Sequence, residues 1–257
     1  MSEKNDMNDV NQMTIKRAFE RPEWYLRKTA YNIKIRVETV KHFVRGAKAK
    51  NILDIGCGDG SLSLPLLDRS NRLTLLDRSK SMLDIAFSRL PEGSSDRVTL
   101  CNEDFLTAQL PPHSFDLILC VGVLAYIEKL GPFLSRIVSV LAPGGTIIVE
   151  CSDGKHFIVR ASRAYVTLRR KLGAEDFETA CRSSAEVVAA FKELGYEVGN
   201  SFRYSLPLPI VRKLLPQSVS YGTIRFVYGT AAQNRAAWLG SECLYRFEGT
   251  KNRKLNR

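Results

Sequence analysis

Short apolar runs alternate with helical patterns along the middle of the chain. Runs rich in Val, Ile, Leu and Phe, as expected for strands buried on both faces, occupy residues 52–55, 73–76, 98–101, 115–120 and 146–151. Between these runs, the spacing of apolar positions predicts helices over residues 62–67, 81–90 and 124–141. Repeated strand–helix units of this kind predict a doubly wound α/β fold, in which a mainly parallel sheet carries helices on both faces.

The pattern differs on either side of this region. Residues 14–46 predict a helix interrupted at Arg21-Pro22 and rich in aromatic and basic residues, which we interpret as an arm or lid. Beyond residue 151, a basic amphipathic stretch spans 157–172, and a helix with a Ser183–Glu186 capping box and a Gly195 stop spans 183–194. Residues 196–204 and 243–247 are candidates for the last strands. We therefore divide the chain into an N-terminal helical arm (1–48), a core (49–154) and a basic region (155–257) that holds cap insertions and the last strands of the core sheet.

A glycine-rich turn follows the first predicted strand. In NILDIGCGDG, residues 51–60, glycine occupies every second position from Gly56 to Gly60, which removes side chains and lets a ligand approach the backbone. Asp77 closes the second predicted strand 21 residues after Gly56, a spacing at which a carboxylate accepts hydrogen bonds from both hydroxyls of a ribose. The glycines and the acid together predict an adenosine-bearing cofactor.

The details of the turn favour one type of cofactor. Dinucleotide-binding turns follow the pattern Gly-x-Gly-x-x-Gly, but here the third glycine comes one residue early, at Gly60, and position 61 is Ser. Asp54 also lies inside the strand just before the turn, where its carboxylate would repel a pyrophosphate. The same charge suits a ligand that carries an ammonium and a sulfonium.

The order of motifs resembles that of the class I S-adenosylmethionine-dependent methyltransferases. The resemblance covers about residues 50 to 151 and is carried by DIGCGDG at 54–60, Asp77, EDF at 103–105, FDLI at 115–118 and LAPGG at 141–145. It implies a Rossmann-like core with a seven-stranded sheet whose last strand enters antiparallel, together with an N-terminal helical lid and C-terminal cap insertions.

The resemblance also implies a set of contacts with S-adenosyl-L-methionine. The backbone of the glycine turn would lie against the methionine part, an acid at its base would face the amino group, and the acid that closes the second strand would hold the ribose. The residues for these three roles are Gly56, Cys57 and Gly58 in the turn, Asp54 at its base, and Asp77 at the end of the second strand.

After the third strand, Asp104 and Phe105 would bind adenine, and Arg78 and Met82 would cover its ring. The Val121 carbonyl, past the fourth strand, would face the ammonium, and Tyr31 or Arg36 in the arm would bind the carboxylate.

Methyl transfer needs an aligned nucleophile, and for a hydroxyl acceptor a general base helps. His156 follows the fifth predicted strand, at the edge of the sheet where ligands of open α/β folds bind, and is our candidate catalytic base, with Tyr126 as a weaker candidate. His113 is expected to be exposed and His42 structural. Residues 120–126 lack the Asn/Asp-Pro-Pro-aromatic clamp of nucleic-acid amino-methyltransferases and a Pro-Cys nucleophile. We therefore expect a small-molecule acceptor, such as a quinone, a sugar or a lipid-linked intermediate.

Charge adds a second feature. The net charge of the chain is +11, and residues 155–257 hold 18 Lys/Arg against 8 Asp/Glu. Such a surface favours anionic partners, so a peripheral membrane or an anionic substrate could contact the basic C-terminal region, and nucleic acid is disfavoured without being excluded. The insertions at 155–180 and 207–239 are expected to lie over the acceptor pocket.

The remaining composition sets broad limits. The six cysteines show no Cys-x-x-Cys spacing and are expected to be reduced and structural, and we expect no metal site. The polar start of the chain, with no apolar segment of spanning length, predicts a cytoplasmic protein. Our hypothesis is an enzyme that transfers a methyl group from S-adenosyl-L-methionine to a hydroxyl, or an amine, of a small molecule. Three alternatives stay open: an RNA methyltransferase, an NAD-dependent oxidoreductase, and a non-catalytic cofactor-binding subunit.

Overall fold

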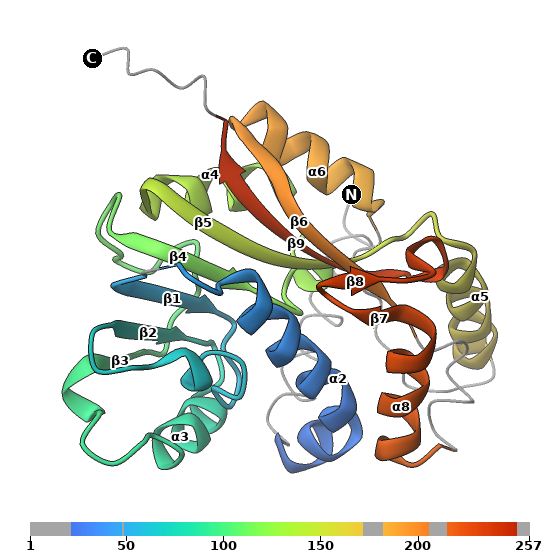
Figure 1. Ribbon diagram of the computed structural model, residues 1–257, viewed down its shortest axis with the longest axis horizontal. Coiled ribbons are helices and arrows are strands. Elements are labelled where there is room, and N and C mark those ends of the chain that lie inside the picture. Colours follow the sequence, from blue (N-terminus) through green and yellow to red (C-terminus); the bar gives the residue numbers. More distant parts are fainter. Residues whose placement is uncertain (1–21, 48, 172–181, 206–214, 251–257) are drawn as a thin grey trace.

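A seven-stranded sheet forms the centre of the protein (Figure 1). The computed structural model describes residues 22–47, 49–171, 182–205 and 215–250, so predictions for other residues lie outside it. The strand order is β3-β2-β1-β4-β5-β9-β6. The strands are β1 (Asn51–Ile55), β2 (Arg72–Leu76), β3 (Val98–Cys101), β4 (Phe115–Cys120), β5 (Leu141–Ser152), β6 (Tyr196–Tyr204) and β9 (Glu242–Gly249).

The pairing of the strands confirms the predicted doubly wound sheet. β1 lies between β2 and β4 and pairs in parallel with both, and β2–β3 and β4–β5 are also parallel. β9 is antiparallel to β5 and to β6, so one late strand is inserted against the common direction, as expected. The chain reverses its direction of winding at β1, which opens a crevice at the carboxyl ends of β1 and β4.

Helices cover both faces of this sheet. They are α2 (Pro22–Phe43), α3 (Lys80–Ser88), α4 (Leu130–Val140), α5 (Phe157–Lys171), α6 (Ser184–Glu193) and α8 (Gln217–Tyr228). Short 3-10 turns occur at η1 (Leu64–Leu66), η2 (Ser95–Arg97), η3 (Leu124–Tyr126) and η4 (Ala237–Leu239), and β7 (Gly229–Thr230) pairs with β8 (Gln233–Asn234) in a hairpin.

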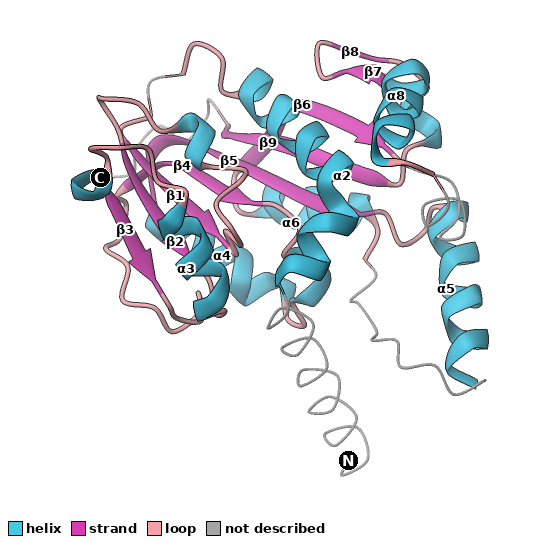
Figure 2. Ribbon diagram, turned by 90° about the horizontal axis from the view of Figure 1, so that it is seen from below, coloured by secondary structure: helices cyan, strands magenta, loops and turns pink. Residues whose placement is uncertain are grey.

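Two apolar cores result, one on each face. On one face, α4 and α6 bury Phe133 and Phe191 against the sheet, where the Phe191 ring stacks on that of Phe247 at 4.1 Å. On the other face, α2, α3 and α8 bury residues such as Ile35, Leu83 and Ile224 (Figure 2). The continuous apolar runs of the central strands are explained by this double coverage.

Two predicted helices are wrong in extent. The helix expected over 62–67 is only the 3-10 turn η1, because Pro65 has no N–H to donate and restricts the residue before it. The helix expected over 124–141 is divided into η3 and α4, because the backbone is extended at Ile127 and Lys129. β5 then begins at Leu141, five residues before the predicted strand. The Ser183–Glu186 capping box is present as predicted.

The described part of the N-terminal arm packs on the sheet and on the C-terminal region. Glu38 on α2 accepts a hydrogen bond from the Tyr221 hydroxyl (2.8 Å) and pairs with Arg225, both on α8. The two segments that flank the core in sequence therefore form one side of the molecule together. Within the described ranges, none of the helices has both the length and the apolar character required to cross a bilayer.

Candidate functional site

A small cavity lies at the crevice where β1 and β4 end. Its volume is about 70 Å³, and it is lined by Ile33, Arg36, Asp54, Gly56, Cys57, Gly58, Asp59, Ser61, Leu62, Met82 and Val121. The structure thus brings together seven of the predicted cofactor residues, from the arm, the glycine turn, α3 and the loop after β4. The other five, Tyr31, Asp77, Arg78, Asp104 and Phe105, lie outside this lining.

The glycines of the turn serve different purposes. Gly56, Gly58 and Gly60 all have positive φ, which glycine adopts without strain. A Cβ on Gly56 would lie 2.5 Å from the Val123 side chain, and one on Gly60 would lie 2.8 Å from Leu64. Glycine is therefore needed at these two positions so that Val123 and Leu64 can pack against the turn. A Cβ on Gly58 would meet nothing within 4 Å. Gly58 is therefore the position at which the turn opens to a ligand.

Asp77 connects the turn to the second strand. One of its carboxylate oxygens accepts from the Gly58 amide (2.8 Å) and the other from the Ser79 amide (2.8 Å). Burial raises the pKa of Asp77, although these two amides oppose the rise. The carboxylate holds Gly58 in place at the point where β2 ends, as a ribose-binding acid should, and its role toward a ribose stays a prediction.

Asp54 carries the least compensated charge of the site. Its side chain is buried, and within the described part of the chain Oδ2 has no hydrogen-bond partner. Burial raises the pKa of Asp54 to about 7; the Ser63 hydroxyl opposes this, and the Asp77 and Asp59 carboxylates add to it. Asp59 is itself paired with Arg89. A cationic ligand would relieve the cluster, whereas a pyrophosphate would worsen its repulsion.

The residues expected to bind adenine lie along the ends of β3 and α3. Asp104 accepts from the Leu106 amide (2.9 Å) and is 3.6 Å from Arg78. The Phe105 ring is buried edge-to-face against Phe133, which leaves its backbone as the part that can meet a ligand. Met82 is buried in the first turn of α3, beside the cavity.

The two arm residues proposed for the cofactor carboxylate differ in their surroundings. Arg36 lines the cavity, and its Nε donates to Glu150 on β5 at 2.9 Å in a buried ion pair. Glu150 also accepts from the Tyr204 hydroxyl (3.1 Å). Tyr31 is buried in the core, and its backbone N–H donates to Gln217 at 3.1 Å. Of the two, Arg36 is the one placed to meet a ligand in the cavity.

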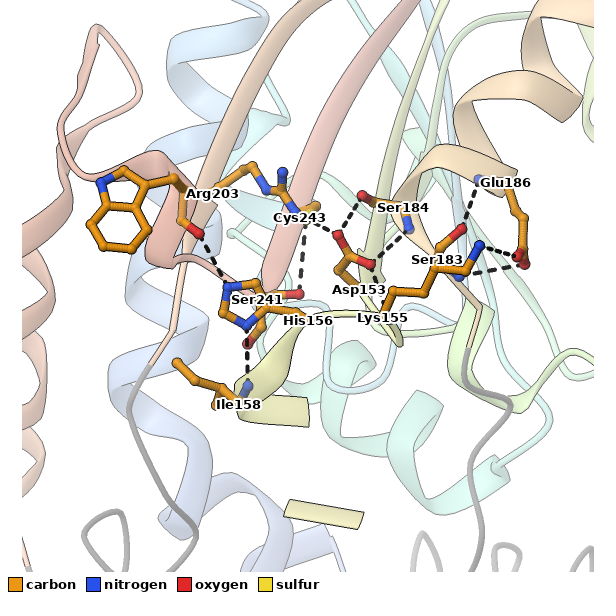
Figure 3. A network of polar contacts seen from close by, with 11 residues as sticks. Asp153, Lys155, His156, Ile158, Ser183, Ser184, Glu186, Arg203, Ser241 and Cys243 are labelled. Carbon is orange, nitrogen blue, oxygen red and sulfur yellow. Dashed lines mark hydrogen bonds and ion pairs between the residues drawn. The ribbon is translucent and has the colours of Figure 1, made fainter. Parts of the chain in front are cut away.

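The candidate catalytic residues lie further out. Tyr126 is half-buried on η3, after β4. Both ring nitrogens of His156 are engaged: Nδ1 accepts from the Ile158 amide (3.3 Å) and Nε2 contacts the Trp238 carbonyl oxygen at 3.1 Å (Figure 3). Neither residue lines the cavity, so both catalytic roles stay predictions. The neutral ring has only one N–H, and these two contacts already use the acceptor and the donor.

Sequence reasoning missed three residues of the site. Asp59 was treated only as part of the turn, Ser63 was not considered, and Glu150 was read as an ordinary strand residue. Glu150 had a detectable signal, because a lone acid inside the run Thr146–Cys151 would be costly to bury without a cationic partner. No comparable signal marks Ser63, whose place beside Asp54 depends on how the chain turns after Gly60.

Two buried cysteines near the site have thiols that stay protonated. The five described cysteines are all free, and Cys181 lies outside the described residues. Burial raises the pKa of Cys57 and of Cys120, and the nearby carboxylates add to the rise, so these thiols remain protonated.

Comparison with known proteins relates the central part of this chain to methyltransferases. A family model described as a methyltransferase domain matches residues 52–145. An uncharacterized methyltransferase of Mycobacterium bovis is 34% identical over 98 residues, which are 38% of this chain and 48% of that protein. A ubiquinone biosynthesis O-methyltransferase of Bradyrhizobium sp. is 31% identical over 122 residues, 45% of this chain and 47% of the relative. The match thus spans about half the length of these relatives.

Solved structures agree on the fold. A methyltransferase of Thermotoga maritima, described as a "possible histamine N-methyltransferase", aligns with a TM-score of 0.66 at 16% identity, over 93% of this chain and 99% of that one. The N-methyltransferase NodS of Bradyrhizobium japonicum in complex with S-adenosyl-L-homocysteine aligns with a TM-score of 0.56 at 18% identity, over 88% and 91% of the two chains. The predicted resemblance to class I methyltransferases and the predicted fold are confirmed.

Proposed function

With the methyltransferase domain at residues 52–145 as the premise, we propose that this protein transfers a methyl group from S-adenosyl-L-methionine to a hydroxyl, or less readily an amine, of a small molecule. The observation that carries the proposal is the buried carboxylate of Asp54, whose Oδ2 has no hydrogen-bond partner among the described residues, beside the open side of Gly58. A cavity that presents negative charge and bare backbone fits an adenosyl ligand with an ammonium and a sulfonium.

Residues of the cavity and of the segments next to it would share the binding of this cofactor. Asp54 would attract the amino group, Arg36 the carboxylate, and Asp77 would meet the ribose while it holds Gly58. Asp104 would accept from the adenine amine. When bound, the cofactor supplies a methyl group on a positively charged sulfur. The chain then has to exclude water and align the acceptor, which accounts for a substantial part of the rate enhancement of such displacements.

The acceptor class is supported by the relatives and by the outer residues. One matched relative is a ubiquinone biosynthesis O-methyltransferase and another, of Tropheryma whipplei, is a demethylmenaquinone methyltransferase. Tyr126, on η3 just after β4, would be the weaker candidate for contact with such an acceptor. His156 could serve as a base only by releasing one of its two present partners.

Transfer from methyl-labelled cofactor to fractionated cell extract tests the proposal. We expect the label in the small-molecule or lipid pool. Gly58→Val, whose side chain would enter the open space, should abolish both cofactor binding and labelling. Label in the RNA pool alone would support the RNA methyltransferase alternative and overturn the acceptor class. Cofactor binding with no labelling of any pool would indicate a non-catalytic subunit, and heat protection by NADH but not by S-adenosylhomocysteine an oxidoreductase.

A further inference from the structure

Helix α5 differs from the other helices in how it meets the rest of the protein. Each of α3, α4, α6 and α8 has fully buried side chains, whereas among the described side chains of α5, residues 157–167, none is buried. Figure 2 shows α5 at one end of the molecule, away from the helices that cover the sheet. A helix of this length rarely stays folded without a surface to pack against.

The described side chains of α5 divide into a half-buried face and an exposed face. One face is half-buried and holds Ile158, Val159, Tyr165 and Val166. The other face is exposed and places the Phe157 ring and Ala161 beside Arg160 and Arg163. The sequence FIVRASRAYVTLRRK contains no acidic residue and ends in two further arginines and a lysine. A basic amphipathic helix with no acid is typical of segments that lie on an anionic surface.

The first turn of α5 is rigidly attached to the core (Figure 3). Asp153 accepts from the Ser184 hydroxyl (2.8 Å) and from Arg203 (2.7 Å), and the Gly154 amide donates to the Arg182 carbonyl (2.7 Å). Partial burial acts to raise the pKa of Asp153, but the contacts from Ser184 and Arg203 outweigh it and lower the pKa. The anchor therefore stays charged, and α5 leaves the sheet edge in a defined direction just after β5 ends.

His156 links the start of α5 to the backbone of η4, and each of these two segments carries an exposed aromatic side chain. Its Nε2 contacts the Trp238 carbonyl oxygen, and its ring centroid lies 4.6 Å from that of Phe157. Phe157 is 59% exposed and Trp238 is 73% exposed. Large apolar side chains with this much exposure, beside a basic helix, are of the kind that enter the headgroup region of a bilayer, where Trp is enriched.

From these observations we infer that α5 and the η4 segment around Trp238 form a docking surface for a bilayer that contains anionic lipids. The arginines would meet lipid phosphates while Phe157 and Trp238 enter the interface. The phosphates of a nucleic acid would also pair with the arginines, but they would give the exposed Phe157 and Trp238 side chains no apolar environment. The surface lies at the same edge of the sheet as the cavity, and the inference holds whether or not the protein transfers methyl groups.

Flotation of the full chain with phosphatidylcholine vesicles, with and without an equal part of phosphatidylglycerol, tests this inference. We expect flotation only with the mixed vesicles, and loss of flotation at high salt. The double variant Arg160→Gln/Arg163→Gln should weaken binding about thirtyfold, because each basic residue near an anionic surface contributes about 1 kcal/mol. Arg69→Gln/Arg72→Gln, which removes the same charge from exposed positions at the start of β2, should bind as the unmodified protein does.

A second pair of variants tests the aromatic contribution. Phe157→Ser should weaken binding about tenfold or more, from the apolar area that leaves the interface. Phe87→Ser is the matched control, because Phe87 on α3 is 57% exposed but lies away from α5. Circular dichroism and thermal unfolding show whether each variant is folded, independently of any ligand.

Three results would overturn the inference: equal flotation with neutral and anionic vesicles, equal loss in the two double variants, or RNA that displaces the protein from vesicles through the same arginines. Failure of methyl transfer would leave the flotation result unaffected, so the two proposals fail separately.

Discussion

Two acids of the central sheet are almost completely buried, and they are treated in opposite ways. Asp54 on β1 and Glu150 on β5 are 1% and 2% exposed. Glu150 is paired with Arg36 from the arm and accepts from the Tyr204 hydroxyl of β6. Asp54 has the Ser63 hydroxyl nearby, two further carboxylates around it, and an oxygen without a partner in the described residues.

The difference separates a carboxylate that the chain pairs itself from one that it leaves to a ligand. A buried ion pair gives Glu150 a cation within the chain, so Glu150 and Arg36 fasten the arm to the sheet beside the cavity. A buried carboxylate that the chain leaves uncompensated costs stability, and evolution retains such a cost most readily where a ligand supplies the missing charge. An acid at the same depth thus forms a clamp between the arm and β5 in one case and marks a binding site on β1 in the other.

The largest expected effect comes from breaking the clamp. Glu150→Gln should lower the free energy of unfolding by about 3–5 kcal/mol, because it removes the charged partner of the largely buried Arg36 guanidinium. Chemical denaturation measures this, and Glu197→Gln, at an exposed position of β6, is the control. A loss below 1 kcal/mol would mean that water compensates Arg36 and that the pair is no clamp.

Replacing Asp54 on β1 should raise the free energy of unfolding, whereas replacing Glu150 should lower it. With a pKa of about 7 in the folded state against about 4 in the unfolded chain, Asp54 holds its proton longer when folded, so its contribution makes stability fall as pH rises from about 4 to 7. Asp54→Asn should remove this slope and, without cofactor, raise the free energy of unfolding at pH 8 by up to about 4 kcal/mol. Chemical denaturation at pH 4 and pH 8 measures this effect. If the free energy of unfolding changed equally with pH in the variant and in the unmodified protein, the raised pKa would not belong to Asp54.

Loss of Asp77 should weaken ligand binding and leave the ion pair between Arg36 and Glu150 unaffected. Asp77→Ala should weaken the binding of S-adenosylhomocysteine by about 1–3 kcal/mol, because the ribose hydroxyls and the Gly58 amide lose a charged acceptor. Calorimetry measures the affinity. Asp84→Ala removes a similar charge from an exposed position of α3 and serves as the control. Unchanged affinity would discredit the ribose assignment.

The smallest expected effect is the pH dependence of binding. If the amino group of the cofactor needs the ionised form of Asp54, affinity for S-adenosylhomocysteine should rise about fivefold between pH 6 and pH 7, as the carboxyl loses its proton. Asp54→Asn should bind more weakly and show no such rise. Calorimetry between pH 6 and pH 7 measures the affinity of both proteins. If the affinity of the variant also rose with pH, the proton would belong to another group.

Local patterns predicted the core of the fold well and its surroundings less well. The central strands were found because double burial requires continuous apolar runs, and the capping box of α6 because its two side chains act within one turn. The predicted helix at 62–67 failed because Pro65 was given too little weight against an apolar spacing. Of the predicted cofactor residues, those of the turn from Asp54 to Gly58 line the cavity together with Arg36, Met82 and Val121, and what they bind stays a prediction.

What the sequence determined by itself is the cofactor half of the protein, because its recognition rests on backbone conformations and on acids at fixed distances from one glycine turn. Only the tertiary structure decided which glycine opens to a ligand, which of two buried acids is paired, and that Arg36, Glu150 and Tyr204 meet. The last of these depends on contacts between segments more than fifty residues apart, for which a single sequence carries no local signal. The other two depend on how the chain packs around the turn, including contacts as short as Gly60 with Leu64.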